Sequence, residues 1–384
     1  MSPFDALCTG TVADEMDASG VVTGILKKKG RTPLLLVFAV FVAGGFLWFL
    51  FPRHDFPSYE MIDLGTFGWD HARATDVSNK GHIAGWGIVV WGEIAEDDIY
   101  AFVWDMEKGL RDLGTLGGKN SFAHGCNDEG MVVGEAETSD GSRHAFLWTP
   151  EAGMKDLGTL GGKKSVAFAI NNRGEVVGEA ETLSGERRPF RWDSAKGMTD
   201  LSMPNSVQGT ARAINDAGRI VGEILMPNSR HHAFYWDKDT GMVDLVGTEG
   251  PSSYATDINE AGQVVGNVFN REFDNYTGFV WKKKTGLQGL HESYAESYAE
   301  RINDAEEIIG RVRTYGGLFF SSRQFHYLQR PSGPLVDLDQ YSPYDPDCIK
   351  ATAINNQGWI VGQRETTSGG RRVYSAVLLK PKQE

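Results

Sequence analysis

One unit of about 44 residues recurs along most of this chain, and this repetition restricts the fold more than any other feature of the sequence. A leucine of the unit recurs at spacings of 49, 44, 44, 44, 45 and 48 residues, and a glycine follows seven residues after a polar residue in every copy. The leucines are Leu64, Leu113, Leu157, Leu201, Leu245, Leu290 and Leu338, and the polar residues are Ser78, Asn127, Asn171, Asn215, Asn259, Asn303 and Asn355. The chain therefore carries seven copies of one structural unit.

Each copy contains four short apolar or alternating runs separated by turn residues, which is typical of β-strands. In the third copy the first strand is expected to end at Asn171, and Gly174 can supply the positive φ of a tight hairpin. The third strand contains Phe190 and Trp192, which alternate as in a strand with one buried face. Four strands per repeat predict the blades of a β-propeller. We therefore predict an all-β fold, a seven-bladed β-propeller over residues 59–384.

The two ends of the repeat array predict that the ring closes. The first Asp-Leu-Gly block, at residues 63–65, has no preceding strands of its own repeat, and the last copy ends near Leu379 without a fourth strand. Residues 59–65 can supply that fourth strand, which would remove the exposed edges of an open array. An open solenoid and a six-bladed ring with one loose repeat are the alternatives.

An apolar segment precedes the repeats. Residues 34–51 contain no charge, and 18 residues of helix span about 27 Å, close to the hydrocarbon thickness of a bilayer. Four basic residues just before it (Lys27, Lys28, Lys29 and Arg31) predict a cytoplasmic N-terminus. We expect a cytoplasmic tail (1–32), a transmembrane anchor (33–52), a linker (53–58) and an extracytoplasmic propeller, with a cleaved signal peptide as the alternative.

Charge and cysteine content exclude several kinds of partner. Acidic residues outnumber basic ones by 51 to 38, and the net charge of −13 argues against a nucleic-acid partner. The 3 cysteines are too few for a disulfide framework or a four-cysteine zinc site. No phosphate-binding loop, nucleophile elbow or zinc-protease motif is present in the sequence. We therefore expect no cofactor, no metal site and no catalytic residue.

Two triplets, His144-Ala145-Phe146 and His232-Ala233-Phe234, accompany Asp-Leu-Gly-Thr-Leu-Gly-Gly blocks at residues 112–118 and 156–162. With these motifs, residues 61–380 resemble the HAF-repeat family. The resemblance implies an extracellular, bacterial-type repeat protein, and it brings no established activity.

The histidine of the triplet is not expected to bind a metal, because its position varies between the copies. By counting along the sequence, we assign to it Tyr100, His144, Arg188, His232, Thr277, Arg323 and Ser375. The recurring phenylalanine and tryptophan of the third strand predict packing between blades. Asp156 and its equivalents are expected to accept backbone hydrogen bonds, and Cys126 is expected to be a buried thiol.

The irregular copies predict a binding surface. The connection between the second and third strands is longer in copies 1, 6 and 7, which become neighbours when the ring closes. Loops on a rigid scaffold commonly carry binding residues, although terminal repeats also vary without function. The expected aromatic-acidic patch contains Trp69, Trp91, Tyr315, Phe319, Phe320, Tyr341, Tyr344, Glu93, Glu96, Asp97, Asp98, Asp345 and Asp347.

From these features we expect a membrane-anchored binding or scaffold module with a glycan or an envelope protein as its ligand. The first alternative is an enzyme acting on envelope glycans, with an acid/base pair drawn from the carboxylates of residues 93–98 and 345–347. The second alternative is a calcium site at Asp337, Asp339, Asp345 and Asp347, which lacks a proper calcium-loop pattern.

Overall fold

The computed structural model describes residues 58–90, 98–203, 206–291, 293–315, 322–341, 349–368 and 370–382. The chain separates into two units, 1–58 and 59–384, and the second contains all of the regular structure described below. No helix among the described residues is both long enough and apolar enough to span a bilayer. The predicted tail (1–32) and anchor (33–52) lie outside the described residues, as does the linker up to residue 57.

Within the described ranges, 28 strands form six hydrogen-bonded sheets, five of four strands and one of eight. The first sheet comprises β2 (His71–Val77), β3 (Ile83–Val89), β4 (Asp98–Asp105) and β5 (Gly109–Asp112). The eight-stranded sheet comprises β6 (Gly117–Cys126), β7 (Val132–Thr138), β8 (Arg143–Thr149), β9 (Gly153–Asp156), β10 (Gly161–Ile170), β11 (Val176–Thr182), β12 (Arg187–Asp193) and β13 (Gly197–Asp200). It consists of two antiparallel meanders, which are joined by a parallel pairing of β8 with β10.

The other sheets follow in chain order. One comprises β14 (Gln208–Ile214), β15 (Ile220–Leu225), β16 (His231–Asp237) and β17 (Gly241–Asp244). The next comprises β18 (Ser253–Ile258), β19 (Val264–Asn270), β20 (Asn275–Lys282) and β21 (Gly286–Leu290). It is followed by β22 (Glu296–Ile302), β23 (Ile308–Arg313), β24 (Gln324–Gln329) and β25 (Val336–Asp337), and by the 3-10 helix η1 (Leu338–Tyr341). The last comprises β26 (Ile349–Ile354), β27 (Ile360–Ser368), β28 (Arg371–Pro381) and β1 (Tyr59–Gly65).

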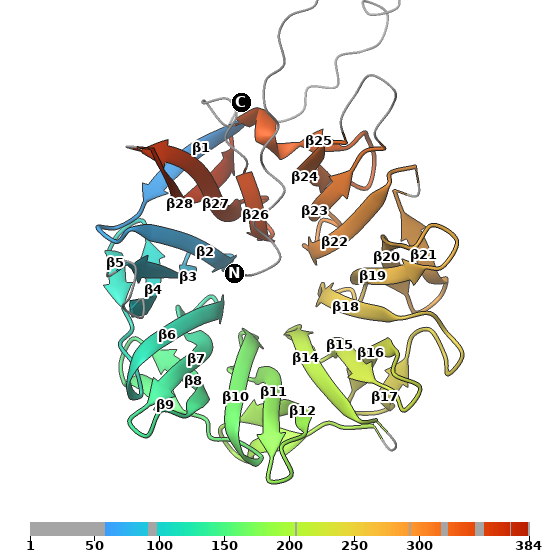
Figure 1. Cartoon of the computed structure of the whole chain (residues 1–384), viewed down its shortest axis with the longest axis horizontal. Coiled ribbons are helices and arrows are strands. Elements are labelled where there is room, and N and C mark those ends of the chain that lie inside the picture. Colours follow the sequence, from blue (N-terminus) through green and yellow to red (C-terminus); the bar gives the residue numbers. More distant parts are fainter. Residues whose placement is uncertain are drawn as a thin grey trace, which may run out of the picture. The chain divides into compact units, whose positions relative to one another are not determined.

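The sheets are arranged radially around a central channel, with β2, β6, β10, β14, β18, β22 and β26 innermost (Figure 1). Neighbouring inner strands contact one another around the whole ring, including β26 with β2. β1 pairs antiparallel with β28, from Tyr59 opposite Pro381 to Gly65 opposite Ala376. The predicted use of residues 59–65 as the last strand is therefore confirmed, and the alternative of an open array was wrong.

Six of the seven inner strands turn into their neighbour through an asparagine, and β2 does so through Ser78. The side-chain oxygen of Asn171 accepts hydrogen bonds from the backbone N–H groups of Arg173 and Glu175, both at 3.0 Å. Gly174 then takes a φ of +74°, as its sequence position predicts. The sixth repeat has Glu306 at the equivalent place, with a φ of 59° and an ion pair to Lys282 at 3.0 Å.

The second strand has a glycine at the same position in every repeat because the structure leaves no space for a side chain there. A Cβ atom on Gly178 would lie 1.9 Å from the carbonyl oxygen of Val166 and 2.8 Å from the Phe190 ring. Phe190 itself is fully buried, and each hydrophobic cluster joins two neighbouring repeats. One such cluster combines Ala84 and Val103 with Phe146 and Trp148, which confirms the predicted packing between blades.

The register of the sixth repeat corrects the assignment that counting gave. Tyr327 lies opposite Gly310, as Phe190 lies opposite Gly178, so Tyr327 occupies the phenylalanine position. Its hydroxyl donates a hydrogen bond to the Tyr298 carbonyl oxygen at 3.1 Å. The position of the triplet histidine therefore belongs to Phe325 in this repeat, and the assignment of Arg323 was wrong.

Candidate functional site

The described part of the predicted patch is largely packed against the fold. The Trp69 ring stacks on Tyr100, with centroids 6.1 Å apart and planes 7° apart. Tyr341 packs against Tyr59 at 5.3 Å, whereas the side chain of Tyr315 is 59% exposed. Asp98 begins β4. The other patch members (Trp91, Glu93, Glu96, Asp97, Phe319, Phe320, Tyr344, Asp345 and Asp347) lie outside the described residues, so the patch stays a prediction.

The triplet histidines pair with aspartates of the Asp-Leu-Gly block. His144 Nδ1 lies 2.9 Å from Asp156 Oδ2, and His232 Nδ1 lies 2.8 Å from Asp244 Oδ2. The other oxygen of Asp156 accepts a hydrogen bond from the Gly158 N–H at 2.7 Å, as predicted. Each pair joins the third and fourth strands of one repeat. Sequence analysis missed this pairing, for which the recurring separation of twelve residues was the available signal.

Metal binding has no support in the described part of the chain, where no group of three or more histidine, cysteine, aspartate or glutamate side chains is placed to hold an ion. Of the residues suggested for calcium, Asp337 and Asp339 lie 2.9 and 3.5 Å from Arg323. Cys126 is buried, as predicted, and burial raises the pKa of its thiol well above the usual value.

Side-chain amides connect the inner strands around the channel. Asn215 donates to the carbonyl oxygen of Asn259 at 2.9 Å, and Asn259 donates to that of Asn303 at 3.2 Å. The same bond runs from Asn127, Asn171, Asn303 and Asn355 to the next repeat. Only Ser78 lacks the amide among the residues at this position, and its hydroxyl is 3.3 Å from His82 Nδ1 instead. We call this set the amide ring; these residues are 3–6% exposed.

A second ring lies one residue further along, and it carries negative charge. The Glu260 carboxylate accepts the backbone N–H of Asp216 at 2.6 Å, and the Asp304 carboxylate accepts that of Glu260 at 2.8 Å. Its members are Asn79, Asp128, Asn172, Asp216, Glu260, Asp304 and Asn356. Burial and the neighbouring carboxylates raise the pKa of Glu260. We call its four acidic members (Asp128, Asp216, Glu260 and Asp304) the acidic rim.

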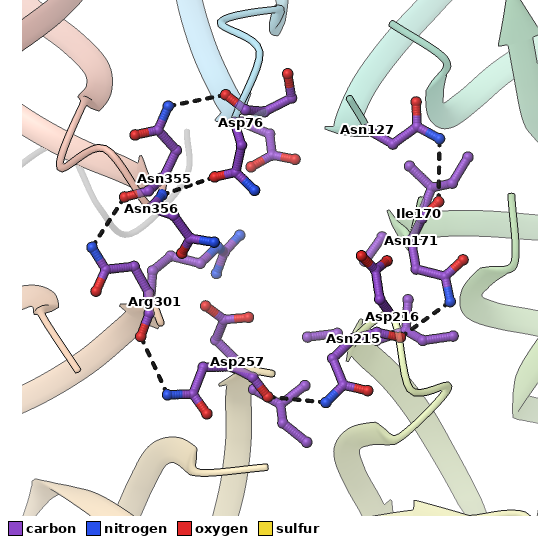
Figure 2. Close-up of a pocket in the computed structure, with 18 of the residues that line it drawn as sticks. Asp76, Asn127, Ile170, Asn171, Asn215, Asp216, Asp257, Arg301, Asn355 and Asn356 are labelled. Atoms are coloured by element: carbon purple, nitrogen blue, oxygen red, sulfur yellow. Dashed lines mark hydrogen bonds between the residues drawn. The ribbon is translucent and has the colours of Figure 1, made fainter. Parts of the chain in front are cut away.

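The two rings enclose a polar pocket of about 250 Å³ in the channel. Figure 2 shows Asp257 and Arg301 pointing into this pocket, with Asp76 on the neighbouring wall. All three precede the amide-ring position of their repeat by two residues. The other four repeats have a small residue there (Gly125, Ala169, Ala213 and Ala353). Comparison of the copies at this position could have revealed these three residues, but our sequence analysis compared the copies at the triplet histidine and by loop length.

The charges of this pocket influence one another. Burial raises the pKa of Asp257 to about 6, while the positive charge of Arg301 opposes that rise and the negative charge of Asp76 adds to it. Burial likewise raises the pKa of Asp76, and Arg301 again opposes the rise. The three groups therefore share one electrostatic environment inside the channel.

A second charged cluster lies further along the inner strands. It contains Glu300. Burial raises the pKa of this carboxyl, although the positive charges of Arg311, Arg301 and Arg73 oppose the rise. Burial, together with nearby cations, lowers the pKa of His326 to about 3. His326 is 7% exposed, and its Nδ1 has no hydrogen-bond partner among the described residues. Repeat 6 thus supplies most of this second cluster, and repeat 1 adds Arg73.

Several solved structures share this architecture. The chain matches the β-propeller domain of the Trilobed protease from Pyrococcus furiosus, with an open velcro topology, at a TM-score of 0.57 and 11% identity, over 82% of this chain and 97% of that one. It matches the acylaminoacyl peptidase of Pyrococcus horikoshii at 0.55 and 12% identity, over 84% of this chain and 54% of that one, so it spans about half of that protein. The fold and the channel therefore define a β-propeller.

No family model matches the chain, and no curated protein matches it either. The resemblance to the HAF-repeat family therefore stays a prediction.

The predicted function needs correction. We expected a membrane-anchored module for an envelope glycan or an envelope protein. The two matching structures described above are instead a propeller domain of a protease and a peptidase, and no described residue belongs to a membrane-spanning helix. These findings support a propeller fold and give no evidence of a membrane anchor, so the expected function was wrong. Its alternative, an enzyme that uses carboxylates of residues 93–98 and 345–347, rests on loops that lie outside the described residues apart from Asp98.

Proposed function

We propose that residues 59–382 form a seven-bladed propeller that acts as a non-catalytic scaffold and holds a small polar ligand in its channel. The blade count is supported by the seven inner strands: six are followed by three further strands, and β26 is followed by β27 and β28 and completed by β1. The eight-stranded sheet contributes two blades, because one parallel pairing of Lys164 with Arg143 joins two complete meanders.

The observation that carries the ligand site is the departure of the channel from sevenfold repetition. At this position of the pocket wall four repeats have glycine or alanine, whereas the other three have the charged residues Asp76, Asp257 and Arg301. A concave pocket with a few convergent polar groups is the usual form of a small-molecule site. The amide ring in the lining already bonds each repeat to the next, whereas Asp76, Asp257 and Arg301 form no ion pair among the described residues and can contact a ligand.

Binding and turnover should be measured on the purified full chain. Thermal shift with inorganic phosphate, succinate, L-lysine and cadaverine samples anionic, zwitterionic and cationic ligands, and a chromogenic peptide tests for peptidase activity. Asp257→Asn and Arg301→Gln alter the channel, and Asp239→Asn changes an exposed turn as the matched control. We expect at least one probe to stabilise the wild type but not one of the channel variants, with no peptide turnover.

Two results would refute this function. One is peptide hydrolysis by the chain itself. The other is the absence of binding by every probe, or binding that the channel variants leave unchanged.

A further inference from the structure

The charged residues of the channel are not required by the repeat itself. The position two residues before the amide ring is glycine or alanine in four repeats, and those repeats form the same strand pairing with the same register shift. The three charges at this position come from repeats 1, 5 and 6. They are therefore confined to part of the channel wall, opposite repeats that present only small side chains there.

The two carboxylates are held firmly but are not neutralised. Asp76 Oδ2 accepts the backbone N–H of Cys126 at 2.9 Å, and Asp257 Oδ2 accepts that of Ile302 at 2.9 Å. Each bond fixes its carboxylate against the next repeat. Among the described residues, neither aspartate forms an ion pair. Both groups can thus accept hydrogen bonds from a cation in the pocket without releasing a protein partner.

Arg301 is similarly available. Its Nη1 donates to the Glu300 carbonyl oxygen at 3.0 Å, which orients the guanidinium. No ion pair within the described residues involves Arg301, although its positive charge lowers the pKa of both channel aspartates. A guanidinium has five N–H donors in a planar arrangement that suits a carboxylate. The pocket therefore contains unpaired groups of both signs.

The surroundings favour a ligand with net positive charge. The two channel aspartates and the acidic rim provide six carboxylates around the pocket, and Arg301 and Arg212 provide two guanidinium groups. Fields of one sign in a concave site concentrate ligands of the opposite sign. The volume of about 250 Å³ lies below the usual range of roughly 300–1,000 Å³ for drug-sized ligands, which favours a small molecule.

We propose that the channel binds a small cationic ligand that carries primary ammonium groups and a carboxylate, the chemistry of a basic amino acid. Asp257 and Asp76 accept hydrogen bonds from ammonium groups, and Arg301 holds the carboxylate. This inference rests on the proposed function, since it assigns a chemical class to the ligand of the same site. A metal ion is disfavoured because the described residues do not form a group of ligands for it.

Isothermal titration of the purified full chain with L-lysine tests the inference, and three further probes separate its parts. Cadaverine lacks the carboxylate, L-norleucine lacks the side-chain ammonium, and inorganic phosphate is an anion. The variants are Asp257→Asn and Arg301→Gln, with Asp76→Asn as a second carboxylate variant and Asp239→Asn as the exposed control. Asparagine keeps an oxygen for the Ile302 N–H, so Asp257→Asn is expected to fold; circular dichroism checks this.

We expect L-lysine to bind and L-norleucine to bind roughly tenfold or more weakly, as the loss of a charge-assisted hydrogen bond implies. Asp257→Asn should weaken L-lysine by a similar factor. Arg301→Gln should weaken L-lysine and leave cadaverine unchanged or tighter, and the control should match the wild type.

Three results would overturn the inference. Channel-dependent binding of phosphate without binding of L-lysine would refute the ligand class and leave the proposed function standing. Binding of L-lysine that all three channel variants leave unchanged would place the site elsewhere. Failure of every probe to bind would remove both the ligand class and the ligand site.

Discussion

Replacing Asn215 by alanine tests whether the amide ring holds neighbouring repeats together. The Asn215 side chain donates to the Asn259 carbonyl oxygen at 2.9 Å and accepts the Arg219 N–H at 3.0 Å. The residue is 4% exposed, so water cannot readily replace either bond. A buried hydrogen bond contributes about 1 kcal/mol, and an unpaired buried group costs about 1–3 kcal/mol. We therefore expect Asn215→Ala to lower the free energy of unfolding by about 2–3 kcal/mol.

Equilibrium unfolding of the full chain in guanidinium chloride, followed by tryptophan fluorescence, measures this difference. Asn228→Ala is the matched control, because Asn228 is exposed and its side chain accepts only the Arg230 N–H, at 3.1 Å. That variant should change the free energy of unfolding by about 0.5 kcal/mol or less. If the two variants destabilise the chain equally, or if Asn215→Ala has no measurable effect, the amide ring does not contribute to stability as argued.

Three further substitutions test other parts of the structure. Asp257→Asn should raise the free energy of unfolding by about 1–3 kcal/mol above pH 6 and leave it unchanged below pH 4. The reason is that folding raises the pKa of Asp257 from 3.8 to about 6, so its ionisation opposes folding. Urea unfolding at pH 4 and at pH 7.5 checks this difference. Gly222→Ala should destabilise the fold by about 3 kcal/mol, since its Cβ would lie 2.0 Å from the Thr210 carbonyl oxygen. Gly185→Ala has open space around it and should cost about 1 kcal/mol for its positive φ. Equal melting temperatures of the two variants would contradict this. Tyr327→Phe should cost about 1 kcal/mol in denaturant unfolding by removing its bond to Tyr298, and an unchanged stability would mean that this bond contributes nothing.

The repeat made most of the fold predictable, because each copy has the same pattern of strand and turn residues. The strand positions, the Asn171–Gly174 turn and the closing strand at residues 59–65 all followed from spacing and turn chemistry. The error at Arg323 arose where the connection between two strands varies in length, since counting along the sequence cannot fix the register there. The fully buried Tyr327, opposite Gly310, fixes it in the structure.

The candidate site was harder to predict from the sequence, because its members are far apart in the chain. Asp76 and Asp257 are separated by four repeats and meet only when the ring closes. The predicted patch relied on the most irregular loops, whereas the pocket lies between strands whose pairing is regular and whose side chains differ at one position. Differences between copies at one aligned position, rather than differences in loop length, pointed to the channel.

The closing strand also has a consequence for synthesis. β1 is among the first parts of the propeller to be made, but its partner β28 ends about 320 residues later, at Pro381. At about 5–20 residues per second, the ribosome needs roughly 15–60 s to complete that distance. During this time β1 has no strand to pair with, and Met61 and Ile62 lack the final sheet against which they later pack. The nascent chain therefore carries an unpaired apolar strand through nearly all of its translation, so a chaperone that covers residues 59–65 would have most of that period in which to act.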